Sequence, residues 1–130
     1  MAVNQFILDS DILIEHLRGR EQAKTFLAQL HEAGELLVSV MTVAELIAGI
    51  RHHREEEGVE ALLRLLRMVP VDENIARRGG HIRRQYQQSH GTGLVDALIA
   101  ATAELTGATL VSFNRRHFPM IPNLQVPYQR

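Results

Sequence analysis

Residues 94–113 have the sequence LVDALIAATAELTGATLVSF. The first part of this stretch, as far as Leu105, is apolar nearly all round, which is typical of a helix buried on every side. The second part, residues 109–113, is a short apolar run that is typical of a strand covered on both faces. A buried helix that leads directly into a buried strand predicts a layered α/β domain.

The rest of the chain continues this alternation. Unbroken apolar blocks predict further strands at residues 5–9, 36–40, 68–71 and, weakly, 124–126. Apolar residues spaced i, i+3, i+4 and i+7 predict helices around residues 23–30, 59–66 and 75–86. Gly79 and Gly80 weaken the last of these helices, because each glycine costs about 1 kcal/mol relative to alanine. The alternation predicts a three-layer sandwich, in which a mostly parallel sheet of four or five strands is flanked by helices.

Length and composition narrow the class of protein. The chain has 130 residues, which fits a single domain spanning residues 1–130. It has no apolar run long enough to span a membrane, and its N-terminus lacks the features of a signal peptide, so we expect a cytoplasmic protein without membrane contact. The absence of cysteine excludes disulfides, thiol nucleophiles and cysteine-based metal sites. The seven histidines show no metal-ligand spacing, which argues against a zinc site.

The charges are nearly balanced but unevenly distributed. The net charge of −1 gives the molecule no overall basic field to attract nucleic acid. Thirteen of the 14 basic residues are arginines, several of them in pairs: Arg77–Arg78, Arg83–Arg84 and Arg115–Arg116. Such pairs suit phosphate groups, although paired arginines are also common on a merely solvated helix face.

Three acidic residues lie within apolar stretches, where an ionised carboxylate is costly to bury unless it is paired, hydrogen-bonded or bound to a metal. They are Asp9, Glu45 and Asp96. Each also has a purely structural explanation. Asp9 or Asp11 could cap a helix over residues 12–17, and Thr42 and Glu45 fit a capping box. Asp96 suits the first turn of a helix, where a negative charge is favourable.

The joint placement of these acids predicts a functional site. Asp9 ends the first strand, Glu45 is expected in the first helical turn after the second, and Asn114 follows the fourth. Asp96 begins the helix that leads into the fourth strand. In an open parallel sheet the carboxyl ends of the strands share one edge, and ligands bind where the strand order reverses. Carboxylates gathered there repel one another unless a cation is present, and ligands that are all oxygen favour Mg²⁺ or Mn²⁺.

Three segments resemble the PIN domain, and in particular the VapC toxins of bacterial toxin–antitoxin pairs. They are FILDSDILIEHL (residues 6–17), SVMTVAELIAGI (residues 39–50) and GLVDALIAATAELTGATLVSFNRRHF (residues 93–118). The likeness covers nearly the whole chain, and the order and spacing of the segments suit a PIN domain.

The resemblance implies a set of site residues. Asp9, Glu45 and Asp96 match the three acids of the family, and Asp11 takes a position often held by asparagine. Asn114 matches a fourth position that is aspartate in many relatives, which puts a direct metal contact by this residue in doubt. Two serines also fall near the site: Ser112 stands where relatives often have threonine, and Ser10, which follows the first acid, is expected to hydrogen-bond there and help to bind the substrate.

The resemblance also implies an activity and partners. It implies an endoribonuclease that hydrolyses single-stranded RNA with Mg²⁺ or Mn²⁺ held by Asp9 and Asp96, and with Glu45 completing the acidic site. If the substrate is RNA, our candidates for holding its phosphates are Arg115, Arg116 and the arginines of residues 77–84. A small VapB-like antitoxin would wrap the toxin and inhibit it, and the toxin would form a homodimer.

Three other classes of protein remain as alternatives. A haloacid-dehalogenase-type phosphatase shares an Asp-x-Asp after a strand, matched by Asp9 and Asp11, but needs a downstream lysine and a further acidic pair. Lys24 is the only lysine, and no such pair follows. A phospho-receiver module likewise needs a lysine after its last strand. A catalytically weak PIN domain that only binds a partner is argued against by the three intact acids, while Asn114 leaves it open.

Overall fold

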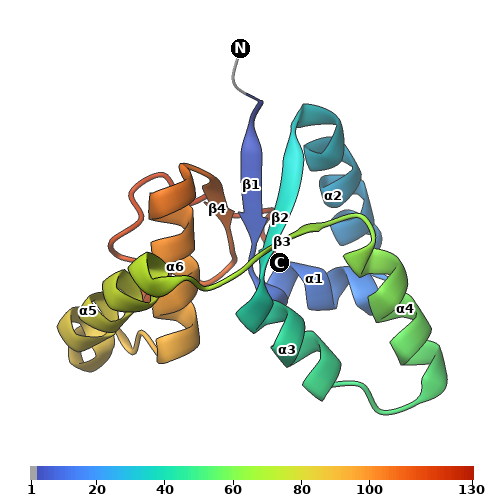
Figure 1. Ribbon diagram of the computed structural model, residues 1–130. Coiled ribbons are helices and arrows are strands. Elements are labelled where there is room, and N and C mark those ends of the chain that lie inside the picture. The colour runs from blue at the N-terminus through green and yellow to red at the C-terminus, as the bar shows by residue number, and fades with distance from the viewer. Residues whose placement is uncertain (1–2) are drawn as a thin grey trace.

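Four short strands form a parallel sheet in the computed structural model, which describes residues 3–130 (Figure 1). The strands are β1 (Gln5–Leu8), β2 (Glu35–Ser39), β3 (Arg67–Val69) and β4 (Thr109–Val111). They lie in the order β3-β2-β1-β4, so the strand order reverses between β1 and β4. The weak strand predicted near the C-terminus is reduced to one parallel bridge between Val111 and Gln125.

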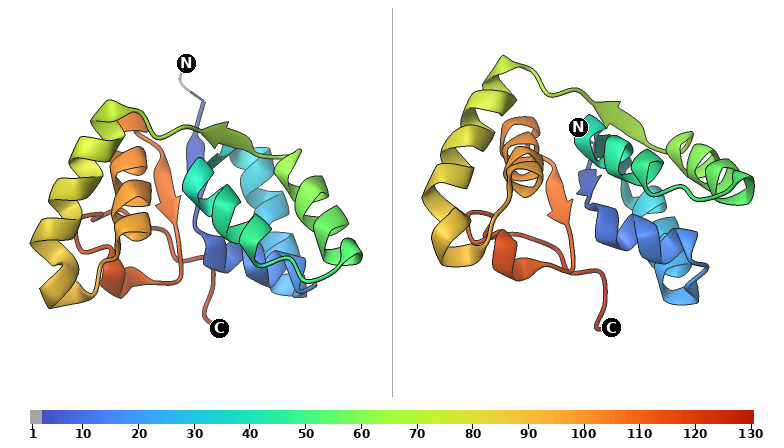
Figure 2. Two further views of the ribbon diagram at one scale, coloured as in Figure 1. Left: turned by 60° about the horizontal axis from the view of Figure 1, so that its bottom comes forward. Right: turned by 90° about the horizontal axis from the view of Figure 1, so that it is seen from below.

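Helices cover both faces of the sheet, as the three-layer prediction requires (Figures 1 and 2). They are α1 (Ser10–Leu17), α2 (Glu21–Ala33), α3 (Val40–Ala48), α4 (His53–Leu63), α5 (Glu73–His90) and α6 (Leu94–Thr106). One face carries α6 with α5 outside it, and the other carries α1, α2 and α4. Helix α3 leaves the carboxyl end of β2, and a short 3₁₀ turn, η1 (Arg115–His117), follows β4. Along residues 3–130, no helix has the length and apolar character needed to span a bilayer.

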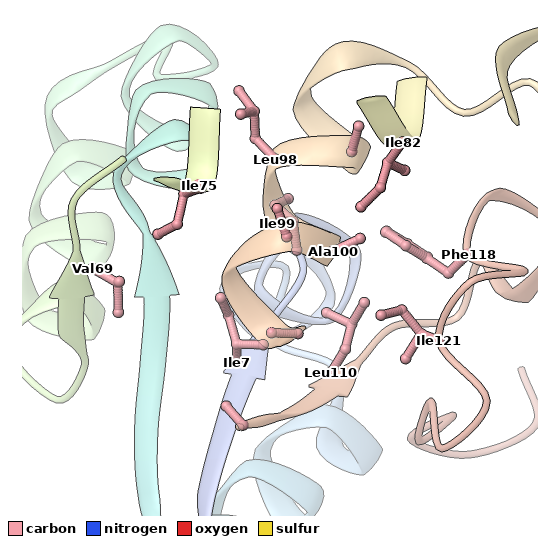
Figure 3. Packing of buried hydrophobic residues seen from close by; sticks show 14 of the residues in the cluster. Ile7, Val69, Ile75, Ile82, Leu98, Ile99, Ala100, Leu110, Phe118 and Ile121 are labelled. Carbon is pink, nitrogen blue, oxygen red and sulfur yellow. The ribbon is translucent and has the colours of Figure 1, made fainter. Parts of the chain in front are cut away.

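Neighbouring residues of β1, β2 and β4 belong to two separate hydrophobic cores. Ile7 and Leu110 pack with the residues of α5 and α6 (Figure 3). The next residues along the same strands, Leu8 and Val111, pack on the opposite face with α1, α2 and α4. Side chains of a strand alternate between its faces, so a strand buried on both sides must be apolar at every position. This requirement explains the unbroken apolar blocks in the sequence.

The start of α3 differs from the prediction. The helix begins at Val40, and the Ser39 side chain caps it by accepting a hydrogen bond from the backbone N–H of Met41 at 3.1 Å. The capping box predicted for Thr42 and Glu45 is therefore wrong, and Glu45 lies in the second turn rather than the first. Ser39, the last residue of β2, starts the helix three residues earlier than a Thr42 cap would. Glu45 is thus not needed to cap the start of the helix.

Helix α5 continues through Gly79 and Gly80, and the two glycines have different surroundings. A Cβ atom added to Gly79 would lie 2.6 Å from Cδ2 and 3.2 Å from Cα of Leu98 in α6, whereas one added to Gly80 would meet nothing within 4 Å. Gly79 therefore lets α5 and α6 approach closely, and this packing compensates for the low helix propensity of glycine.

Alanine at these two positions is expected to have opposite effects on stability. Gly79→Ala should lower the free energy of unfolding by about 1–3 kcal/mol, because the added methyl group overpacks the contact with Leu98. Gly80→Ala should raise it by up to about 1 kcal/mol through helix propensity alone. Urea unfolding followed by circular dichroism measures both. Equal effects of the two substitutions would contradict the packing explanation.

Candidate active site

The carboxyl ends of β1 and β4 lie side by side, at the point where the strand order reverses. Asp9 directly follows β1, and its backbone N–H donates to the carbonyl of Val111 at 3.0 Å. The Ser112 hydroxyl donates to Oδ2 of Asp9 at 2.7 Å and lies 3.1 Å from Oδ2 of Asp11. A hydroxyl has one hydrogen, so Ser112 shares it between two carboxylates. Ser112, the residue directly after β4, thus contacts two acids that are more than 100 positions away in the sequence.

Backbone N–H groups also donate to the carboxylates of this pair. Asp9 caps α1 by accepting from the N–H of Ser10 at 2.8 Å. Asp11 accepts from the N–H groups of Ile12 at 2.6 Å and Phe113 at 2.9 Å. The positive end of the α1 dipole and these donors favour negative charge at the start of the helix. They fix the orientation of both carboxylates.

A second group of polar side chains surrounds Asp96, which lies in the first turn of α6. Nδ1 of His117 lies 2.9 Å from Oδ2 of Asp96 and 2.7 Å from Nδ2 of Asn114. The backbone N–H of Asn114 donates to the Ser112 hydroxyl at 3.0 Å, which links this group to the Asp9 pair. The segment after β4 therefore contacts all three aspartates of the site.

The pKa of Asp9 shows how far burial and neighbouring carboxylates disfavour its ionised form. Only 6% of Asp9 is exposed, and its pKa is raised from 3.8 to about 7. Loss of solvent is the largest cause, and the charges of Asp11 and then of Asp96 also raise the pKa. Hydrogen bonds from Ser112 and Ser10 oppose the rise. At neutral pH this carboxyl group therefore exchanges its proton readily.

The neighbouring acids show the same effect. The pKa of Asp11 is raised chiefly by burial, against the hydrogen bonds that it accepts. Glu45 is an exposed residue of α3, yet partial loss of solvent and then the charge of Asp96 raise its pKa. The charge of Asp96 thus acts on both Asp9 and Glu45, and the three predicted acids share one electrostatic site.

The acidic side chains are not arranged as a complete set of ligands around one metal ion. Within residues 3–130 no three acidic or histidine side chains converge on a common point suited to a metal. The donors are nevertheless all carboxylate oxygens. Burial raises the pKa of Asp9, Asp11 and Glu45, and neighbouring carboxylates raise those of Asp9 and Glu45 further, so a divalent cation would relieve the cost of ionising them. The donor set therefore fits Mg²⁺ or Mn²⁺, provided that the side chains move to share it.

The sequence assigns no definite role in the site to three residues: Asp11, Ser112 and His117. It places Asp11 as a helix cap, as a match to a family position or as part of an Asp-x-Asp pair, and Ser112 only as a match to a family position. The Asp-x-Asp directly after a strand is the signal that marks Asp11. Ser112 and His117 follow β4, and their contacts depend on β4 lying next to β1, which no local pattern indicates.

The residues predicted to contact RNA differ in their exposure and in whether ion pairs already engage them. Ser10 takes part through its backbone N–H. Arg115 and Arg116 are exposed on η1, directly beside Asn114 and His117. Within the stretch of residues 77–84, two arginines are engaged in ion pairs at 2.7 Å, namely Arg77 with Glu73 and Arg78 with Glu104, while Arg83 and Arg84 are exposed.

A cavity of about 570 Å³ opens beside Glu45, between α1, α3 and α4. Its apolar lining comes from Ile14, Leu17, Leu46, Ile50 and Val59. Arg18 and Arg54 also border it. Arg51 and His52 do so as well, but they lie 3.0 and 3.2 Å from Oε1 of Glu55, which is another lining residue. The cavity therefore joins an apolar surface to a rim whose free charges are basic, and it reaches one acid of the site.

These features define a class of protein. The chain matches the model of the PIN domain over residues 6–123, and it belongs to this family. It is 44% identical over 123 residues to ribonuclease VapC10 of Mycobacterium tuberculosis, covering 94% of this chain and 92% of that protein. It is also 44% identical to ribonuclease VapC19 of the same organism, covering 94% of this chain and 98% of that protein.

A solved structure shows the same architecture. A toxin–antitoxin complex from Klebsiella pneumoniae contains a chain that superposes with a TM-score of 0.78 at 28% identity, covering 95% of this chain and 98% of that one. The predicted PIN-like α/β sandwich is confirmed by this likeness, and the predicted resemblance to VapC toxins is confirmed by the relatives.

Proposed function

We propose that this protein is a metal-dependent endoribonuclease that hydrolyses phosphodiester bonds of single-stranded RNA and that a cognate antitoxin inhibits. The observation that carries the proposal is the cluster of carboxylates at the switch point of the sheet, where burial and the charges of neighbouring acids raise the pKa of Asp9 to about 7. The relatives named as ribonucleases support it. The alternative of a PIN domain that only binds a partner does not account for this electrostatic cost.

Asp9 and Asp96 are the residues that would hold Mg²⁺ or Mn²⁺, with Glu45 completing the acidic site through a water or a second ion. A divalent cation there would lower the pKa of water and offset negative charge on the phosphate. Ser112 and the N–H of Ser10 orient Asp9, so that it is positioned before the substrate arrives. Asn114 lies beside Asp96 but is held by His117, so we assign it to the surroundings of the site.

The exposed arginines are candidates for holding the RNA backbone. Arg115 and Arg116 extend from η1 at the edge of the acidic site, where a guanidinium can bind a phosphate next to the bond that is cut. Arg83 and Arg84 on α5 could bind the RNA at a greater distance from the bond that is cut. They are better suited to this than Arg77 and Arg78, whose charges are already paired.

Cleavage of a labelled, unstructured RNA tests the proposed activity. The purified chain should cut it with Mg²⁺ or Mn²⁺ present, EDTA should abolish cutting, and excess Mn²⁺ should restore it. Direct hydrolysis by water would leave 5′-phosphate and 3′-hydroxyl ends. Cutting that persists in EDTA, or ends bearing a 2′,3′-cyclic phosphate, would show that the RNA 2′-hydroxyl attacks and that our scheme is incorrect. Hydrolysis of a small phosphomonoester without RNA cleavage would favour the phosphatase alternative.

The cavity beside Glu45 is our proposed site for the antitoxin. Its apolar lining suits one face of an amphipathic helix, and its basic rim suits acidic residues on that helix. A segment seated there would reach Glu45 and so could interfere with the acidic site directly. We also expect a homodimer, for which exposed Ile47 and Leu94, on the two helices that carry Glu45 and Asp96, offer apolar surface.

A further inference from the structure

Neighbouring residues hold both the backbone and the imidazole of His117, which lies on the short 3₁₀ turn η1. The Thr92 hydroxyl donates to its backbone carbonyl at 2.7 Å. Gly91 lies against its far side, where an added Cβ would come within 3.3 Å of Nε2, and the positive φ of +70° at Gly91 also favours glycine. Only 32% of the His117 side chain is exposed. The loop between α5 and α6 thus forms a seat for this ring.

The contacts of Nδ1 determine where its hydrogen lies. An ionised Asp96 can only accept a hydrogen bond, so the short contact to Oδ2 requires a hydrogen on Nδ1. The same nitrogen then cannot accept from the amide nitrogen of Asn114 at 2.7 Å. Amide orientations are assigned from the hydrogen-bond network, and turning this amide by half a turn presents its oxygen to Nδ1–H. The consistent network therefore has one N–H shared between Asp96 and Asn114.

We infer that His117 is a positioning residue for Asp96: its Nδ1–H occupies Oδ2 of the carboxylate and leaves Oδ1 free to bind a divalent cation. This inference rests on the proposed function. Groups that hydrogen-bond to a metal ligand fix its direction, and their loss commonly weakens metal binding by about 10- to 100-fold. His117 has a second role in the same network, because it also fixes Asn114 beside the site.

Two amide substitutions separate this role from simple space filling. His117→Asn places an N–H near the position of Nδ1, whereas His117→Gln places one near Nε2, on the side facing Gly91. Mn²⁺ binding to the purified full chain, followed by electron paramagnetic resonance of the free ion, measures the effect without any cleavage assay. His117→Gln should weaken Mn²⁺ binding by about 10- to 100-fold, and His117→Asn should stay close to the unsubstituted chain. Asp9→Asn, which lacks a proposed ligand, sets the background.

Two further results make the outcome decisive. Thermal unfolding without metal should give the same midpoint for both amide variants, because any loss of packing around the ring affects both of them. A difference in Mn²⁺ binding between the two variants then reports the position of the N–H. Equal Mn²⁺ affinity of His117→Gln and the unsubstituted chain would overturn the inference alone. An unsubstituted chain that binds no Mn²⁺ above the Asp9→Asn background would overturn the proposed function, and the inference with it.

Discussion

Asp9→Asn is expected to lower the rate of RNA cleavage by roughly a thousandfold or more, because stabilisation of charge by a bound cation contributes several kcal/mol and each 1.4 kcal/mol corresponds to about tenfold in rate. The substitution removes the negative charge and keeps the shape. The amide oxygen can still accept from the N–H of Ser10, and the Ser112 hydroxyl can turn wholly to Asp11. Single-turnover cleavage of the labelled RNA with saturating Mn²⁺ measures the loss.

Asp72→Asn is the matched control. Asp72 caps α5 by accepting from the N–H of Ile75 at 2.9 Å, just as Asp9 caps α1, and asparagine is an equally good cap. Asp72→Asn should therefore leave both cleavage and stability almost unchanged. Ordinary activity of Asp9→Asn would show that the acidic site has been placed wrongly. Equal loss of activity in both variants would point to folding instead.

Much of the fold could be predicted because burial on both faces leaves a direct record in the sequence. Ile7 and Leu8 of β1 face different cores and must both be apolar, and the same holds for Leu110 and Val111 of β4. Helix α5 was harder to predict, because the benefit of Gly79 lies in its contact with another helix. A helix propensity records only the cost of such a glycine.

Only those residues of the candidate site that lie next to the ends of predicted strands and helices could be predicted from the sequence. Asp9 and Asp96 follow from their positions at the ends of apolar segments, and the family resemblance supports both. The hydroxyl of Ser112 bridges Asp9 and Asp11 only because β4 pairs with β1, and this strand order cannot be read from local patterns. The contact of His117 with Asp96 depends in addition on the seat formed by Gly91 and Thr92.

The stability of the metal-free protein is expected to fall as pH rises through the acidic to neutral range. The pKa of Asp9 is about 7 in the folded protein and about 3.8 in the unfolded chain, so the folded state binds the proton more tightly. The stabilisation is complete below about pH 4, is lost progressively up to about pH 7, and then stays lost. A tenfold change in proton affinity is about 1.4 kcal/mol, so the whole effect is on the order of 4 kcal/mol.

Thermal unfolding of the unsubstituted chain and Asp9→Asn, in EDTA at about pH 5 and about pH 8, isolates this effect. His16 opposes the trend, because burial lowers its pKa, but it is present in both proteins and cancels in their difference. Asp9→Asn should melt several degrees higher than the unsubstituted chain at the higher pH and much closer to it at the lower pH. Mn²⁺ should close the gap at the higher pH, since a cation compensates the ionised carboxylate. A difference between the two proteins that does not change with pH would mean that Asp9 is not the strained acid, and that the charge a metal would relieve lies elsewhere in the site.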